Sequence, residues 1–262
     1  MEDAILRYRS TLAYNREVFL IEHGELVKAL SSIDDNFNVF LDVLRTMHDP
    51  DRKSYVSLIP FVLLLQRQSR AAFEALTAFQ PYLAWVLFRP GIEALLIIGK
   101  WVDDPSNAKV WQNRKDDRRG YQNAYSGKAL KSTSLPSSDR IQRVLSKVND
   151  DFVHANPDYY SRHLKAGIGD PGYVNFWLDY FEDDVLQQAH TVAFLHLLLV
   201  MQDALASLLA NLFAVPVILV SPLVLFRAKF DTRMTGIAAA SSDFAAIPDQ
   251  LGLLPLSKSP II

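Results

Sequence analysis

Two opposite charges stand inside a strongly apolar stretch of the sequence, AWVLFRPGIEALLIIGKW at residues 84–101. Arg89 and Glu93 are four residues apart, a spacing that directs both side chains to one face of an α-helix. A buried charge that loses its partner costs about 3–5 kcal/mol, so each should be hydrogen-bonded. We predict a buried intrahelical ion pair that braces the Pro90-Gly91 irregularity. The alternative is a functional pocket lined by both charges.

His154 is a second residue with catalytic potential. It ends a predicted helix within NDDFVHANPDYYSRH, after Asn149 and before a polar, aromatic loop that contains Asn156 and Tyr159. Histidine changes its protonation near neutral pH and suits acid–base catalysis. A histidine at the C-terminal end of a helix also complements the helix dipole, so the structural interpretation remains open.

The sequence predicts neither a metal site nor a cofactor. Within the predicted helices of the second half of the chain, no histidine and carboxylate have the i, i+4 spacing that presents ligands from one helix face. The chain has no cysteine, which excludes disulfides, thiolate catalysis and zinc–thiolate sites. Glycine-rich phosphate loops, nucleophile elbows and zinc-protease motifs are also missing from the sequence.

A row of polar residues runs along an otherwise apolar helical segment near residue 200. His196, Asp203, Ser207 and Asn211 follow one another at seven- and four-residue steps, which place them on one face. We expect this row to be the solvent edge of a core helix. If the row is buried instead, Asp203 is the carboxylate that would face Arg89 across the bundle.

The segment at 109–131 is locally basic. It carries seven basic and two acidic residues, with Trp111, Tyr121 and Tyr125 interleaved among them. Cations that bind phosphates and rings that stack on bases are typical of single-stranded nucleic acid sites. The candidate contacts are Arg114, Lys115, Arg118, Arg119 and Tyr121. A solvated loop-and-helix face is the commoner explanation of such a segment, and a nucleic-acid site is the functional alternative.

Composition sets the outer limits on function. The chain has 262 residues, 50% hydrophobic and 21% charged, and a net charge of −2. A near-neutral chain has no overall attraction for nucleic acid or anionic lipid, so any such site must be local. The first residues lack the apolar core of a signal peptide, and we expect a cytoplasmic protein. The uncharged stretch 204–226 is long enough to span a membrane, but its polar and proline residues favour a buried helix and an apolar tail.

Helical periodicity dominates the chain and predicts one all-α domain: an up-and-down helical bundle. We expect N-terminal helices over 1–50, with a break near SSIDDN, and a bundle core over 54–213 with a basic insertion at 106–135. Within the core, helices are predicted at 54–79, 84–101, 137–153 and 175–213, with a loop-rich connector before the last and no strand pairing. The tail at 214–262 is expected to wrap over the body.

Two of these segments carry a resemblance to a known group. LFRPGIEALLIIGKWVDDPSNAKVW, followed later by a helix ending in VNDDFVHANPDYY, is similar to all-α proteins related to the HEPN superfamily, over about residues 55–205. The resemblance implies a dimeric helical bundle, found in RNases of toxin and antiphage systems and in non-catalytic binding modules. His154 matches the histidine of the RNase motif, but residues 148–150 lack the arginine that precedes it.

The resemblance therefore implies the fold more than the activity. We expect a non-enzymatic binding or regulatory module, in bacterial stress or defence, that forms a homodimer and binds RNA. One alternative is a metal-independent RNase that uses His154 as general acid–base and Arg89 to stabilise phosphate charge. Another is a small-molecule binder with its pocket at Arg89 and Glu93.

Overall fold

The architecture comes from a computed structural model that describes most of the chain. The described residues are 3–46, 55–153, 157, 161, 163–168, 174–178 and 181–219. Most of the predicted wrapping tail, from residue 220 onward, lies outside them, as does the link between the N-terminal helices and the bundle core.

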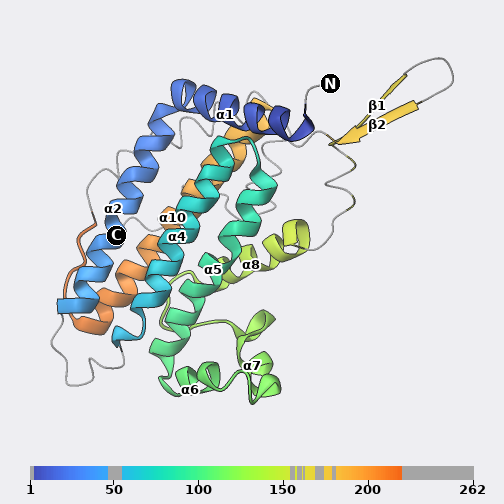
Figure 1. The fold of residues 1–262 in the computed structure, drawn as a ribbon. Helices are drawn as coiled ribbons and strands as arrows, with labels where there is room; N and C mark the ends of the chain where they lie inside the picture. The colour runs from blue at the N-terminus through green and yellow to red at the C-terminus, as the bar shows by residue number, and fades with distance from the viewer. Residues whose placement is uncertain are drawn as a thin grey trace.

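Long helices form the body of the molecule, which confirms the predicted all-α class. Side by side lie α2 (Gly24–Thr46), α4 (Ile59–Thr77), α5 (Pro81–Asp103) and α10 (Asp184–Phe213), while α1 (Ala4–Glu22) crosses one end of them (Figure 1). Shorter elements follow α5: α6 (Ser106–Gln112), α7 (Arg118–Tyr125), the 3₁₀ turn η1 (Gly127–Ala129), α8 (Ser138–Val148) and the π-helical turn η2 (Asn149–Val153). Of these, α8 packs along α5.

The first helical break falls earlier than the sequence predicted. The chain leaves α1 at His23 and re-enters a helix at Gly24, whereas the expected break near SSIDDN lies inside α2. Ser31 and Ser32 donate to carbonyls four residues back, at 3.1 and 3.2 Å, so their hydroxyls are satisfied without ending the helix. Asp34 forms a salt bridge with Arg70 of α4, with 2.6 Å between Oδ2 of Asp34 and Nη2 of Arg70.

The last helix is shorter than predicted, and a strand pair replaces its first part. Residues 174–178, expected to begin that helix, form β2 (Val174–Leu178), which pairs antiparallel with β1 (Leu164–Ile168). The β-branched and aromatic residues of VNFWL favour an extended strand. The helix begins at Asp184 because the side chain of Asp183 caps it, accepting from the amide of Leu186 at 2.9 Å. The hairpin projects from the body near the start of α1 (Figure 1).

One hydrophobic core extends from α1 to α10. The side chains of Trp85, Phe88 and Phe194 meet edge-to-face at its centre, with ring centroids 4.9 Å apart for the Phe88–Phe194 pair. Pro60 lies in the first turn of α4, where a helix tolerates a missing amide donor. Pro90, in contrast, lies inside α5. This core holds α5 and α8 in place, and they position Arg89, Glu93 and Asn149.

Candidate functional site

Arg89 and Glu93 form a closed ion pair on α5, and a third residue completes it. The guanidinium donates from Nη1 and Nη2 to the two carboxylate oxygens of Glu93, at 2.9 and 2.8 Å. Its Nε donates to Oδ1 of Asn149, at 2.5 Å. We call these three residues the arginine clamp. Asn149 was predicted to belong to a ligand-binding site, and in the structure its Oδ1 accepts a hydrogen bond from Arg89.

The clamp is less buried than the sequence predicted. The side chains of Arg89 and Glu93 are 31% and 30% exposed, so the expectation of a buried pair is corrected to a half-buried one. The apolar residues around them in the sequence point to other faces of α5, where Phe88 and Ile92 are fully buried. A bidentate arginine–carboxylate pair fixes orientation as well as charge, so the clamp holds Arg89 in one direction.

The π-helical turn places Asn149 in the clamp. α8 ends at Val148, and residues Asn149–Val153 widen into a single π turn. Lys147 bridges to Asp151 at 3.1 Å across this turn. Phe152 is buried and stacks near Trp85, with ring centroids 6.0 Å apart. Single π turns inside helices are common at functional positions, and this one directs an amide side chain toward α5.

Three predicted site residues lie outside the described part of the chain. These are His154, Asn156 and Tyr159. The RNase hypothesis also needs Arg89 to reach a phosphate, and in this structure Nε, Nη1 and Nη2 of Arg89 all donate to protein oxygens. The clamp geometry therefore matches the architectural interpretation of the Arg89–Glu93 pair.

The polar row of α10 divides between the interior and the surface. His196 is buried, and its Nε2 lies 3.4 Å from Nη2 of Arg140 on α8. Burial, and to a smaller extent the charge of Arg143, lowers the pKa of Arg140. Asp203 is half-buried and is not among the hydrogen-bond partners of Arg89, while Asn211 is exposed. The prediction that this row faces solvent is therefore confirmed only at its C-terminal end, at Asn211.

The basic segment is a compact projection fixed to the end of α5. Tyr125 is buried, accepts from Nε1 of Trp101 at 2.8 Å and donates to the carbonyl of Asn107 at 2.6 Å. Burial raises the pKa of Tyr125 to about 12. Trp111 packs edge-to-face on Trp101 and Phe61, with ring centroids 5.9 and 5.7 Å apart. These rings support the projection, so the predicted role of Trp111 and Tyr125 in stacking on bases is not the one the structure assigns them.

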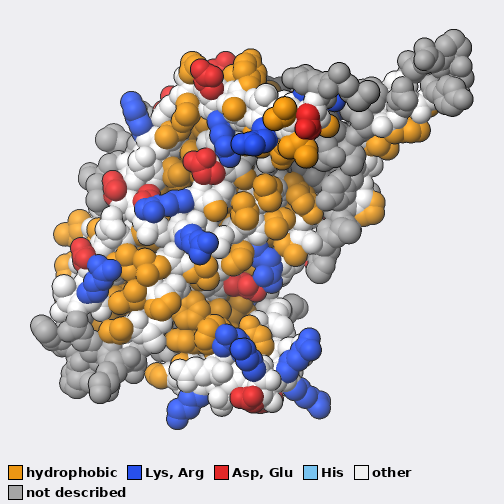
Figure 2. Space-filling view, in the orientation of Figure 1, with side chains coloured by type: hydrophobic (Ala, Val, Ile, Leu, Met, Phe, Trp, Pro, Cys, Tyr) orange, Lys and Arg blue, Asp and Glu red, His pale blue; other side chains and the backbone are white. Residues whose placement is uncertain are grey.

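Four cations of this projection face solvent. Lys109, Lys115, Arg118 and Arg119 are exposed, and we call them the basic face. Figure 2 shows blue side chains crowded over α6 and α7 at the lower end of the molecule. Across the described residues none of the four makes a salt bridge, whereas Lys131 binds Asp139 at 2.6 Å. Arg114 instead lies over the ring of Trp111, 3.8 Å from its centroid, and Tyr121 stacks on Tyr125.

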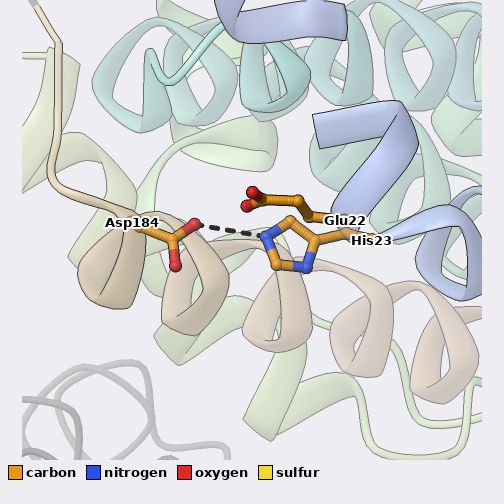
Figure 3. A group of neighbouring side chains, drawn as sticks. All are labelled: Glu22, His23 and Asp184. Carbon is orange, nitrogen blue, oxygen red and sulfur yellow. Dashed lines mark hydrogen bonds and ion pairs between the residues drawn. The ribbon is translucent and has the colours of Figure 1, made fainter. Parts of the chain in front are cut away.

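Sequence spacing gave no sign of a cluster formed by Glu22, His23 and Asp184. The ends of α1 and α10 bring together residues more than 160 positions apart, and His23 Nε2 lies 3.2 Å from Asp184 Oδ1 (Figure 3). Local motifs cannot report such a pair, because only the packing of α1 against the bundle creates it. The one local signal is Asp183-Asp184 before an apolar run, which marks a helix start.

Two described helices, α5 and α10, are long and apolar enough to cross a membrane. In the most apolar window of each, 56% and 89% of the residues are buried inside the protein. For α10 this is the burial of a helix at the centre of a bundle, and length and composition do not distinguish that role from a membrane span.

Comparison with protein-family models, with curated proteins and with solved structures finds no match for this chain.

Proposed function

We propose that the chain is a non-enzymatic helical binding module that binds single-stranded RNA through the basic face on α6 and α7. The observation that carries the proposal is the set of exposed cations Lys109, Lys115, Arg118 and Arg119, none of them in a salt bridge to the described residues. Cations that are not neutralised by the protein can replace the counterions of a phosphate backbone.

The rigidity of the projection supports the same proposal. Its two short helices rest on Trp111 and Tyr125, and Lys100 reaches across to the carbonyl of Ala129 at 2.9 Å. Asp103 accepts from the amides of Thr133 and Ser134, each at 2.8 Å. A rigid array loses little conformational entropy when it binds, so its cations can contribute more of their electrostatic attraction. Recognition by charge alone implies little preference for base sequence.

The test measures the binding of a fluorescent oligouridine by anisotropy at several salt concentrations. A single strand releases about 0.7 counterions per neutralised phosphate, so four contacts predict a slope near −2.8 in log K against log salt. Replacing all four residues of the basic face by glutamine should flatten this slope and abolish binding at about 150 mM salt. A matched control replaces four exposed cations elsewhere, Arg7, Arg9, Lys28 and Arg67, and removes the same charge. Equal losses in both variants would show a general charge effect and contradict the proposal.

We also propose that the chain is a cytoplasmic homodimer that joins through its hairpin. The register places Leu164, Ala166, Val174 and Phe176 on one face, and all four are apolar and exposed. Val174 and Phe176 are 58% and 66% exposed. An isolated two-stranded hairpin is marginally stable in water, so this face needs a cover.

A second copy of the chain would cover this face with an equally apolar one, because Leu164, Ala166, Val174 and Phe176 carry no charge that such a contact would bury. The base of the hairpin also adjoins α1, where Tyr8 stacks on Phe181 and Ile5 and Leu6 are exposed, which extends the apolar surface. Light scattering after size exclusion should give a dimer for the natural chain and a monomer for Phe176→Glu. Lys165→Glu, on the opposite face of β1, should leave the dimer intact. A natural chain that stays monomeric at about 100 µM, well above a micromolar dissociation constant, would refute the arrangement.

A further inference from the structure

We infer that Glu22, His23 and Asp184 bind a divalent transition-metal cation of the Zn²⁺ class. Each residue offers one ligand atom, and the three atoms lie within 4.8 Å of one another. Figure 3 shows the carboxylates of Glu22 and Asp184 on the same side of the His23 imidazole, with Glu22 and His23 at the end of α1 and Asp184 at the start of α10. Imidazole nitrogen with carboxylate oxygen is a donor set that zinc accepts.

The spacing of the atoms agrees with zinc geometry. Ligands bound at about 2.0–2.1 Å in a tetrahedron lie roughly 3.3 Å from one another. His23 Nε2 and Asp184 Oδ1 are already 3.2 Å apart. Glu22 is exposed at the end of α1, so its carboxylate can rotate to complete the set. Solvent reaches the same side, where water can supply the remaining ligand.

The two ligands of the close pair are held in place by neighbours. The imidazole of His23 is buried, with only 6% of its side chain exposed, and it lies edge-on to Phe19 at a centroid distance of 5.1 Å. The second oxygen of Asp184 accepts from Nε2 of Gln188 at 2.6 Å. Such supporting contacts orient metal ligands and reduce the cost of ordering them.

Charge also favours a cation here. Two carboxylates beside a neutral imidazole carry a charge of −2, which a divalent ion balances. A protonated His23 paired with Asp184 would balance half of it and leave Glu22, which makes no salt bridge among the described residues.

A bound ion would fasten α1 to the rest of the fold. Phe19 is the buried residue of this helix. Its side-chain contacts to the α4–α5 region are a hydrogen bond from Nε2 of Gln80 to Tyr8 at 2.6 Å, one from Asn15 to the carbonyl of Ala78 at 3.3 Å, and the 3.8 Å approach of Arg16 to Glu74. None of these three contacts reaches α10. A metal that joins the end of α1 to the start of α10 would tie segments 161 residues apart. The proposed ion therefore has a structural role: it holds the end of the N-terminal helix against the start of α10.

The test titrates the full chain, stripped of metal by a chelator, with Zn²⁺ in a calorimeter and with Co²⁺ by visible absorption. We expect one equivalent to bind and the melting temperature to rise. Glu22→Gln and Asp184→Asn change exposed side chains, so both variants should fold, as circular dichroism can verify. Each should weaken binding by at least about 10- to 100-fold, the loss that removal of a mere supporting partner causes, because each removes a charged ligand.

The control is Glu17→Gln, an exposed glutamate on α1 that lies outside the cluster. It should bind Zn²⁺ as the natural chain does. Absence of saturable binding to the natural chain would overturn the inference. Binding that persists unchanged in the Glu22→Gln/Asp184→Asn double variant would overturn it as well, because the ion would then be held elsewhere. Both outcomes are independent of RNA binding.

Discussion

Asn149 accepts a hydrogen bond from Nε of Arg89, joining the π-helical turn after α8 to the middle of α5. The other edge of the same guanidinium binds Glu93 through two parallel hydrogen bonds. Arg89 is therefore held between a neighbour on its own helix and a partner 60 residues later. The clamp therefore ties the turn at the end of α8 to the middle of α5.

Removing Asn149 should destabilise the fold measurably. In Asn149→Ala the Nε of a half-buried guanidinium loses its acceptor, a loss of about 1–3 kcal/mol in the free energy of unfolding. Urea denaturation would measure it. Asn149→Asp keeps an acceptor and should stay close to the natural chain. Asn123→Ala, at an exposed position of α7, should change stability by less than about 0.5 kcal/mol. If Asn149→Ala left the free energy of unfolding unchanged, the hydrogen bond from Arg89 to Asn149 would add nothing to stability.

The pKa of Tyr125 predicts a loss of stability in alkali. Burial raises this pKa to about 12 in the folded chain, against about 10 in the unfolded chain. As the pH rises from about 10 to about 12, the unfolded state gives up the proton first, so the folded state loses stability. Below about pH 10 Tyr125 is protonated in both states, so its full contribution to the free energy of unfolding is present.

Tyr125→Phe separates this effect from the other tyrosines. The variant lacks the phenol, so its stability should fall less steeply between about pH 10 and about pH 12 than that of the natural chain. At neutral pH it should be less stable by about 1–3 kcal/mol, because Nε1 of Trp101 loses its acceptor. Urea denaturation across this pH range measures both. Identical pH slopes for the two proteins would contradict the assignment.

The fold class could be predicted from the sequence because periodic apolar residues report helices directly. The joints between helices could not, because they depend on contacts over long range. SSIDDN looked like a break, but its serines bond within α2 and Asp34 finds Arg70 on another helix. VNFWL is short enough to be a strand or a helix start, and pairing with residues 164–168 decides it.

In the candidate site, too, local features could be predicted from the sequence and long-range contacts could not. The Arg89–Glu93 pair could be predicted because its partners share one helix face. Its partial exposure could not, because that depends on which face of α5 meets α8. The cluster at His23 was missed entirely, since its closest contact is to Asp184 at the other end of the bundle.

Gly99 should tolerate no side chain, because the segment after η1 packs directly on α5. A Cβ at this position would lie 2.7 Å from Oγ of Ser132 and 2.8 Å from Cβ of Leu135. Ser132 cannot move freely, since its Oγ accepts from the amide of Leu135 at 3.0 Å. We expect Gly99→Ala to cost about 1–3 kcal/mol in thermal or urea unfolding.

Gly24 supplies the matched control for this substitution. A Cβ there would meet no atom within 4 Å, and the residue begins α2. Gly24→Ala should stabilise the chain by about 0.4–1 kcal/mol, because alanine reduces the freedom of the unfolded state. Opposite signs for the two glycine variants are the expected result. Equal effects would mean that the close packing at Gly99 relaxes without cost.

A buried pair of amides should couple α2 to α10. Nδ2 of Asn36 donates to Oε1 of Gln202 at 3.1 Å, and Nε2 of Gln202 donates to the carbonyl of Ile33 at 2.6 Å. Both side chains are fully buried. Asn36→Leu or Gln202→Met alone leaves a buried polar group without its partner, at about 1–3 kcal/mol. The double variant should cost less than the sum of the two, by about 0.5–3 kcal/mol in a double-mutant cycle of urea denaturation. Strict additivity would mean that the amides contribute separately and do not fix the register of these helices.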